Sequence, residues 1–193
     1  KDKIYWICVT SMKSSKSWSK IEIEKREKEI DKVIKEYQFD GFFSLNLPPK
    51  ELDRVQLTNI IEPMSKILNK IKPNILYVPF FADAHSDHQI IGNIYNALGK
   101  WFRYKYKKKI ICYETISETE FNITSNITFK PNKFIDITRF MKKKINIMKI
   151  YKSELGNYPF PRSEQTIKSL GIMRGSQSGY KFAEAFMLIL ERD

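Results

Sequence analysis

Short apolar runs alternate with longer amphipathic stretches, and this alternation most constrains the fold. Continuous apolar and β-branched runs are typical of strands buried on both faces, and apolar residues repeating near every 3.6 positions are typical of helices. The N-terminal half has strand patterns at 4–10, 42–45 and 75–81, with helix patterns at 20–37 and at 52–68, where Pro63 bends or restarts the helix. This strand–helix–strand–helix–strand order predicts a parallel sheet with right-handed crossovers.

The C-terminal half continues with helices and strands. Helix patterns occur at 88–102, 137–151 and 164–175, strand patterns at 110–114 and 180–190, and a flexible turn is expected from Gly175 to Gly179. The whole pattern predicts an α/β fold, a Rossmann-like three-layer sandwich with a mostly parallel sheet and helices on both faces. Residues 1–193 contain no internal repeat or domain boundary and are expected to form a single domain.

Composition narrows the location and the partners. No apolar run approaches the roughly 20 residues that span a bilayer, and the N-terminus does not resemble a signal peptide. Cys8 and Cys112 lie in apolar runs and are expected to be reduced, which favours a cytoplasmic protein. The net charge is +12, but the lysines are spread along the chain, with local runs only at 104–109 and 141–144. Specific nucleic acid binding is therefore not expected, and it would require a steeply salt-dependent affinity.

Six residues between the apolar run at 75–81 and the next helix pattern stand out chemically. They read Asp83-Ala84-His85-Ser86-Asp87-His88 and contain both histidines of the protein. Such a loop lies at the carboxyl end of a parallel sheet, where open α/β folds bind ligands. Imidazole and carboxylate at this spacing can form a metal site or an acid–base pair. They can equally be a polar helix start, because aspartate is favoured there.

Further residues in chain order favour the chemical interpretation. The six residues resemble the second signature, Asp-x-His-x-Asp-His, of the PIG-L/LmbE-like zinc-dependent N-acetyl-sugar deacetylases. Other landmarks of that family have similar counterparts in the same order: Val9-Thr10, Arg26-x-x-Glu29, Tyr113-Glu114-Thr115, Phe134-Ile135-Asp136-Ile137 and the segment from Arg174 to Phe186. The resemblance spans nearly the whole chain. It implies a metal-dependent hydrolase that removes an acetyl group from an N-acetylated sugar or glycoconjugate, with zinc or another divalent metal as cofactor.

One departure from the family pattern matters as much as the match. The family's first signature, Ala-His-Pro-Asp-Asp-Glu, supplies a zinc histidine, a zinc aspartate and the catalytic aspartate, and no His-Pro-Asp-Asp occurs in these residues. The chain resembles a family member without its first strand–helix unit. We expect that unit to be encoded before Lys1, because His85, Asp87 and His88 are retained together. The 193-residue chain alone is then expected to be inactive and to bind zinc weakly.

The resemblance also implies individual roles. His88 would be the one zinc ligand present, coordinating as a neutral imidazole. His85, as an imidazolium, would stabilise the oxyanion that develops on the amide carbonyl. Asp87 would hold His85 in orientation, and Asp83 would support the ligand from behind. Arg26 would anchor a substrate hydroxyl or phosphate.

Several residues keep a structural alternative. Arg26 could instead form a helix-surface ion pair with Glu29, which would be worth little energetically. Arg174 and Glu184 could reach the pocket or serve as ion-pair anchors, and Tyr113 and the loop 158–160 could stack on a sugar or pack in the core. The competing function is a non-catalytic, degenerate family member that binds a glycan or a protein partner without zinc. The sequence makes no prediction of oligomeric state.

Overall fold

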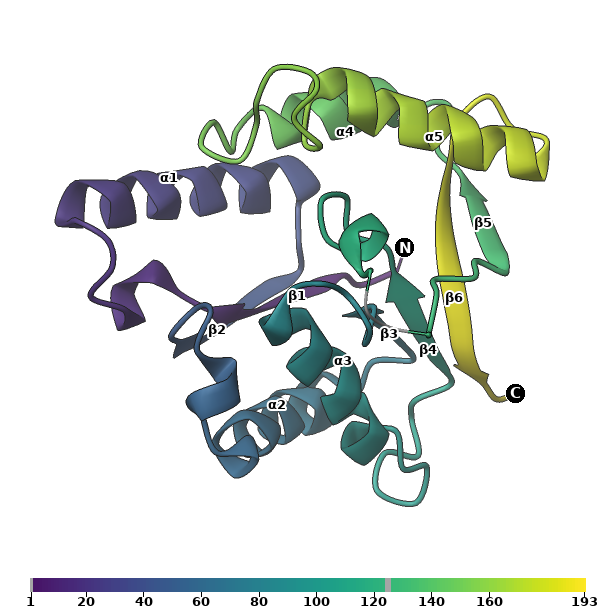
Figure 1. The fold of residues 1–193 in the computed structure, drawn as a ribbon. Coiled ribbons are helices and arrows are strands. Elements are labelled where there is room, and N and C mark those ends of the chain that lie inside the picture. Colours follow the sequence, from purple (N-terminus) through teal and green to yellow (C-terminus); the bar gives the residue numbers. More distant parts are fainter. Residues whose placement is uncertain (1, 124–125) are drawn as a thin grey trace.

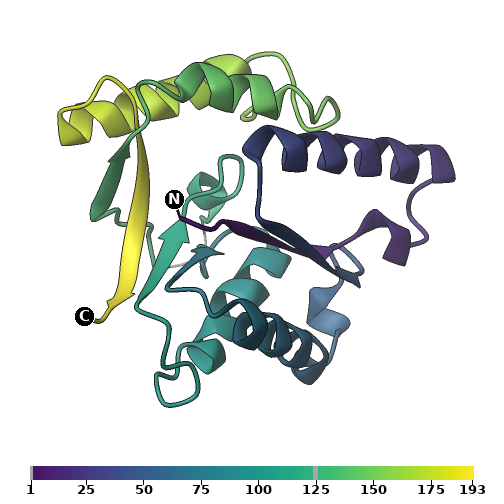
Figure 2. The same ribbon diagram turned by 180° about the vertical axis from the view of Figure 1, so that it is seen from behind.

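The strands lie between two layers of helices, as the alternating pattern predicts (Figure 1). The computed structural model describes residues 2–123 and 126–193. Helices α1, α4 and α5 cover one side of the strands, and α2 and α3 cover the other, as the reverse view also shows (Figure 2). The helices are α1 (Lys20–Tyr37), α2 (Leu57–Ile71), α3 (Ser86–Leu98), α4 (Met141–Met148) and α5 (Glu164–Ser178), with 3-10 turns η1 (Met12–Ser14), η2 (Leu52–Arg54) and η3 (Thr119–Phe121).

The strands form two sheets. Strands β1 (Tyr5–Thr10) and β2 (Gly41–Leu47) pair in parallel, and β3 (Ile75–Pro79) and β4 (Lys109–Tyr113) do the same in a second sheet. That second sheet has the order β3-β4-β6-β5, in which β6 (Ala183–Glu191) runs antiparallel to both β4 and β5 (Lys133–Asp136). Within the described residues, β1 and β3 are therefore edge strands of two separate sheets.

One core joins the two sheets on the side of α2 and α3. Buried residues of α2 and α3, including Ile60, Leu68 and Leu98, pack together with Ile7 of β1 and Leu76 of β3. The shared core holds both parallel pairs against one helical layer. The carboxyl ends of β1 and β3 consequently open toward the same cavity, which Thr10 and His85 both line.

Two details of the predicted helices differ. Pro63 does not restart a helix: it lies inside α2, which begins at Leu57 and has a buried face of Ile60, Met64 and Leu68. The predicted flexible turn at Gly175 is helical, because α5 continues to Ser178 and ends at Gly179 in the left-handed region at φ 78°.

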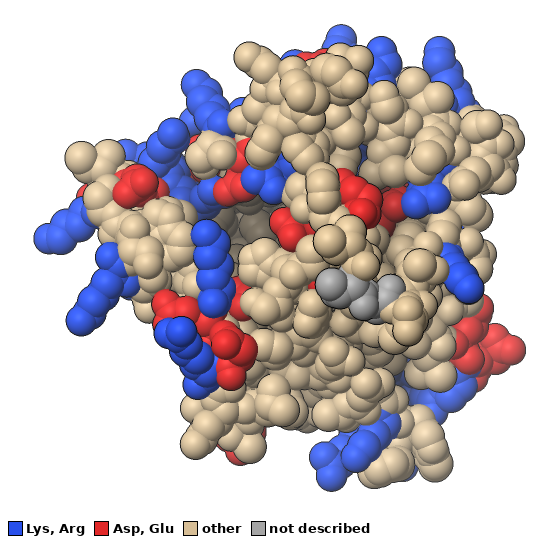
Figure 3. All heavy atoms as spheres, in the orientation of Figure 1, with Lys and Arg blue, Asp and Glu red and all other residues tan. Residues whose placement is uncertain are grey.

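Three structural findings concern the expectations drawn from composition: the helices, the cysteines and the distribution of charge. Within residues 2–123 and 126–193, no helix is long and apolar enough to cross a membrane. Cys8 and Cys112 are free thiols, and Cys112 is buried. Lys and Arg side chains project from several parts of the face in Figure 3, most densely on its left side, and Asp and Glu side chains lie among them. In the two lysine runs, Lys109 pairs with Glu191 and Lys144 with Glu184.

Candidate active site

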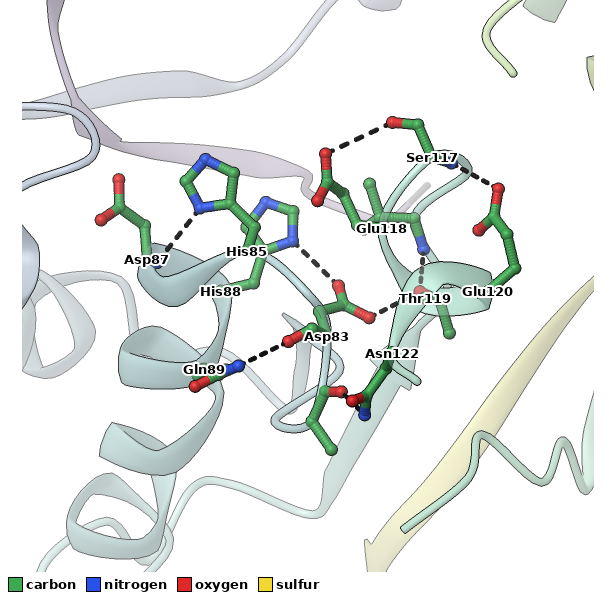
Figure 4. Close-up of polar contacts among 12 residues, drawn as sticks. Asp83, His85, Asp87, His88, Gln89, Ser117, Glu118, Thr119, Glu120 and Asn122 are labelled. Atoms are coloured by element: carbon green, nitrogen blue, oxygen red, sulfur yellow. Dashed lines mark hydrogen bonds and ion pairs between the residues drawn. The ribbon is translucent and has the colours of Figure 1, made fainter. Parts of the chain in front are cut away.

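The histidine motif occupies the turn from β3 into α3. β3 ends at Pro79, Phe80 is buried, and α3 begins at Ser86 with His85 as its N-cap residue. His85 and His88 lie one helical turn apart, so both rings project from the same side of the helix start (Figure 4). Their ring centroids are 4.9 Å apart with an interplanar angle of 22°. The turn thus presents two stacked imidazoles at the carboxyl end of β3.

The carboxylate of Asp83 orients the ring of His88. Its side chain is fully buried, and one carboxylate oxygen lies 2.8 Å from Nδ1 of His88. The other oxygen accepts a hydrogen bond of 2.6 Å from the hydroxyl of Thr119. A carboxylate can only accept in these bonds, so Nδ1 of His88 carries a proton, and in the neutral ring Nε2 keeps its lone pair. This is the tautomer that a metal-ligating histidine uses.

His85 has a different arrangement from the predicted one. Its Nδ1 accepts a hydrogen bond of 3.1 Å from the backbone N–H of Asp87. Because Nδ1 is an acceptor there, the ring is neutral and its proton is on Nε2. The expected imidazolium is therefore not the form that this capping bond favours. The polar-helix-start interpretation also holds for His85, since it caps α3.

The carboxylate of Asp87 does not contact His85 among the described interactions. It accepts hydrogen bonds from the backbone N–H groups of Lys50, at 2.7 Å, and of Leu52, at 3.3 Å. These amides belong to the turn that leads into η2, where they have no helical partner. Asp87 therefore ties the start of α3 to the loop after β2. Sequence spacing could not reveal this contact, because its partners lie 37 and 35 residues away.

A cavity of about 1040 Å³ opens in front of the two histidines. It is visible as a hollow between α1 and the centre of the face in Figure 3. His85, His88 and Asp87 line one side, and Glu118 faces the two rings from the loop before η3 (Figure 4). The inner side of α1 and the segment 151–162 close the cavity opposite them. A space of this size suits a substrate larger than a few atoms.

Arg26 lies on the α1 side of this cavity. Its guanidinium donates to Ser153 Oγ at 3.0 Å, forms an ion pair with Glu154 and lies 5.1 Å from the ring centroid of Tyr151. Glu29 is farther from it, at 3.7 Å, so the surface pair considered from sequence is the lesser contact. Burial raises the pKa of Tyr151 to about 12, with Arg26 acting in the opposite direction. Arg26 is thus fixed in the cavity wall by Glu154.

Several residues that the sequence suggested as possible pocket residues do not line the cavity. Arg174 forms a half-buried ion pair with Glu114 at 2.5 Å, and Glu184 pairs with Lys144. Neither lines the cavity in the described part of the chain, and neither do Tyr113, Tyr158 and Phe160. The aromatic wall comes instead from Trp6, Trp18, Phe42 and Tyr151. Sequence reasoning missed Trp18, although its place just before a helix cap was recognisable from Ser19-x-x-Glu22.

The contacts of the histidine turn determine which of its residues are able to bind a metal ion. His88 fits as one ligand, because its Nε2 lone pair is free of the Asp83 contact. A protein zinc site needs three or four such ligands. Within the residues that the structure describes, no group of three or more His, Cys, Asp or Glu side chains is placed to share a metal ion. The described residues therefore do not form a complete metal site.

Known proteins place this fold in a family. The sequence model of the PIG-L family, described as GlcNAc-PI de-N-acetylase, matches residues 1–98. The structure is similar to the N,N'-diacetylchitobiose deacetylase of Pyrococcus horikoshii, with a TM-score of 0.74, 19% identity and coverage of 97% of this chain and 73% of that one. A conserved protein of Thermus thermophilus has a TM-score of 0.74 and 18% identity, with coverage of 99% of this chain and 83% of that one. A zinc-inhibited form of teicoplanin deacetylase has a TM-score of 0.65 and 11% identity, with coverage of 89% and 76%. At these identities the structures establish a shared fold. The family match covers 98 of the 193 residues, and the protein belongs to the PIG-L family.

Proposed function

We propose that this protein is a metal-dependent hydrolase that removes the acetyl group from an N-acetylated sugar or glycoconjugate. The observation that carries the proposal is the pair of stacked imidazoles at the cavity, with His88 held by buried Asp83 in the tautomer of a metal ligand. The family, described as a de-N-acetylase, supports the same reaction. Two similar structures are named as deacetylases, one of them in a zinc-inhibited form. The proposed cofactor is zinc or another divalent metal, and a cytoplasmic location remains a prediction.

The residues have separate proposed roles. A metal ion bound through His88 would polarise the amide carbonyl and activate water. His85 would donate a hydrogen bond from Nε2 to the oxygen that becomes negatively charged, acting as a neutral donor because Nδ1 is occupied by the Asp87 amide. Asp87 would keep His85 in place through the capping turn and not through its carboxylate. Arg26 would bind a substrate hydroxyl or an anionic substituent from the opposite wall.

The incomplete ligand set leads to a proposal about the domain. We infer that residues 1–193 form a single deacetylase domain that is completed by one further strand–helix unit, with its strand seated between β1 and β3. The two parallel pairs are separate sheets that share one core, which supports this position. The carboxyl end of a parallel strand placed there would face His85 and His88. It could therefore supply the remaining metal ligands and the catalytic base.

Substitution of each histidine in the full-length protein tests the assignment. His88→Ala should abolish both stoichiometric zinc binding and acetate release from N,N'-diacetylchitobiose. His85→Ala should keep the zinc and reduce turnover by about 100-fold or more, the usual loss when an oxyanion donor is removed. Bound metal is measured by elemental analysis and acetate by an enzymatic assay. Full activity in either variant would remove the role given to that histidine.

Zinc analysis also separates the enzyme from a non-catalytic binding protein. Stoichiometric zinc in the full-length protein, together with acetate release, supports the hydrolase. Glycan binding without zinc and without acetate release would support the degenerate, non-catalytic alternative. The non-catalytic alternative is worth testing because the metal-ligand set is incomplete among the described residues.

A further inference from the structure

Trp18 lines the cavity directly before a helix cap. It immediately precedes Ser19, whose side chain accepts from the amide of Glu22 while Glu22 bonds back, forming a complete capping box at the start of α1. The preceding loop is tied to β2 by the hydrogen bond of 2.8 Å from Ser11 N–H to the carbonyl of Leu47. Trp18 is half-buried and lines the same cavity as His85 and His88. The capping box therefore anchors the backbone beside Trp18 at the cavity wall.

Trp18 is linked to the histidine turn through Lys50. The backbone amide of Lys50 donates to the carboxylate of Asp87 at 2.7 Å, and its ammonium lies 6.0 Å from the centroid of the Trp18 ring. That distance is at the outer limit of a cation–π contact, so the flexible lysine can leave the ring face at little cost. The indole face is consequently available to a ligand that reaches His85.

The chemistry of the wall indicates a neutral ligand rich in hydroxyl groups. Five Lys and Arg side chains and seven Asp and Glu side chains line the cavity, although the chain as a whole carries a net charge of +12. Such a balance does not favour a polyanion. Glu29 lies in the same wall and is 7% exposed, and its Oε2 has a 3.7 Å ion pair with Nε of Arg26 but no hydrogen-bond partner in the described part of the chain. A buried acceptor of this kind is stabilised by a donor such as a sugar hydroxyl.

We propose that Trp18 is the stacking platform for a sugar ring of the substrate and that the α1 wall is the glycan subsite. The apolar C–H face of a pyranose ring packs on the negatively polarised face of the indole, and its hydroxyl groups reach the acceptors of the wall. This proposal rests on the deacetylase function proposed above and names the neutral glycan as its substrate class. Trp18 lies on the loop after β1, outside the position inferred for the completing strand.

The test measures sugar binding independently of hydrolysis. N,N'-diacetylchitobiose is titrated into the full-length His85→Ala protein, whose turnover is expected to be about 100-fold lower, and into the same protein carrying Trp18→Leu, Trp18→Phe or Trp101→Leu, followed by calorimetry. Trp18→Leu should weaken the affinity about tenfold, which corresponds to about 1.4 kcal/mol. Trp18→Phe should recover part of it. Trp101→Leu is the matched control, because Trp101 is 61% exposed and is not among the cavity-lining residues that the structure describes.

A purely structural role for Trp18 predicts other results. An apolar residue just before a helix N-cap can pack on the first turn, and leucine keeps that contact, so the Tm of Trp18→Leu should stay close to that of the wild type. Equal affinities with and without Trp18→Leu in the His85→Ala protein would overturn the platform, as would no detectable binding by the His85→Ala protein at millimolar sugar concentrations. Sugar binding that depends on Trp18, together with no acetate release by the wild type, would reject the deacetylase function alone.

Discussion

At the residue scale, the tautomer of His88 is set by one buried carboxylate. Asp83→Asn removes the negative charge that holds the proton on Nδ1, so we expect a mixture of ring tautomers in the 193-residue chain. The free energy of unfolding should fall by about 1–3 kcal/mol, because a buried hydrogen-bond pair is disrupted. Nitrogen-15 NMR of the imidazole reports the tautomer directly. Thr119→Val is the control, since it removes only the outer hydrogen bond to Asp83, and an unchanged tautomer in Asp83→Asn would contradict the assignment.

A second residue-scale prediction concerns Lys107. It is 3% exposed, its ammonium has no hydrogen-bond partner within the described residues, and it lies 4.7 Å from the ring centroid of Tyr104. Burial and the nearby Arg192 lower the pKa of Lys107 to about 8. The folded protein therefore releases this proton at a lower pH than the unfolded chain does. Its free energy of unfolding should rise between about pH 8 and 10.5 and be lower below pH 8.

Lys107→Met isolates this effect. The variant should gain about 1–3 kcal/mol in the free energy of unfolding at pH 7, and the gain should shrink as the pH rises through 8. Urea unfolding of wild type and variant from pH 7 to 9.5 measures the difference, which cancels the titration of the tyrosines. Lys105→Met, at an exposed position in the same segment, should show no such trend. A gain independent of pH would contradict the lowered pKa.

Residue types at the site were predictable, but their contacts were not. Asp83, His85, Asp87 and His88 stand out because they follow a strand pattern and match a family signature. The partners of Asp87 are backbone amides of the loop after β2, and the partners of Arg26 are 127 and 128 residues away. Such contacts depend on how separate loops pack, which short-range periodicity does not encode. The same limit hid Trp18 and Lys50 as neighbours of the site.

At the element scale, α3 is placed by a close contact with the chain after β3. A Cβ added at Gly92 would lie 2.5 Å from the Cα of Phe81, a backbone atom that cannot move alone. Gly92→Ala should therefore lower the free energy of unfolding by about 1–3 kcal/mol and shift the NMR signals of both imidazoles. Gly171→Ala is the control, because its Cβ would meet the flexible end of Met141. Equal stability of the two variants would argue against the close contact.

Elements were predictable where their signal is local, and pairings were not. The helix pattern at 20–37 coincides with α1, and the strand patterns at 4–10 and 75–81 contain β1 and β3. The parallel pairs follow from the strand–helix–strand order. The antiparallel position of β6 between β4 and β5 has no counterpart in periodicity, because the sequence pattern does not specify the neighbours of a strand. The separation into two sheets was likewise not visible in the pattern.

At the scale of the whole molecule, the two sheets make the proposed strand position testable without activity. A strand with neighbours on both sides has its amides bonded alternately to each neighbour, whereas a strand with one neighbour leaves every second amide open to exchange. In the 193-residue chain, β1 pairs with β2 and β3 pairs with β4 within the described residues. Strand β4 pairs with β3 and with β6 along its whole length. We therefore expect alternate amides of β1 and β3 to exchange with solvent at least about tenfold faster than those of β4.

A form of the protein that includes the proposed strand–helix unit supplies the comparison. A strand seated between β1 and β3 would bond to the open amides of both, so their exchange should slow to the rate of β4 in hydrogen-exchange NMR. Strand β4 is the internal control, since β3 and β6 pair with it along its whole length in either form. If the amides of β1 and β3 were already as protected as those of β4 in the 193-residue chain, there would be no open position for a strand. The ligands that complete the His88 site would then have to come from elsewhere.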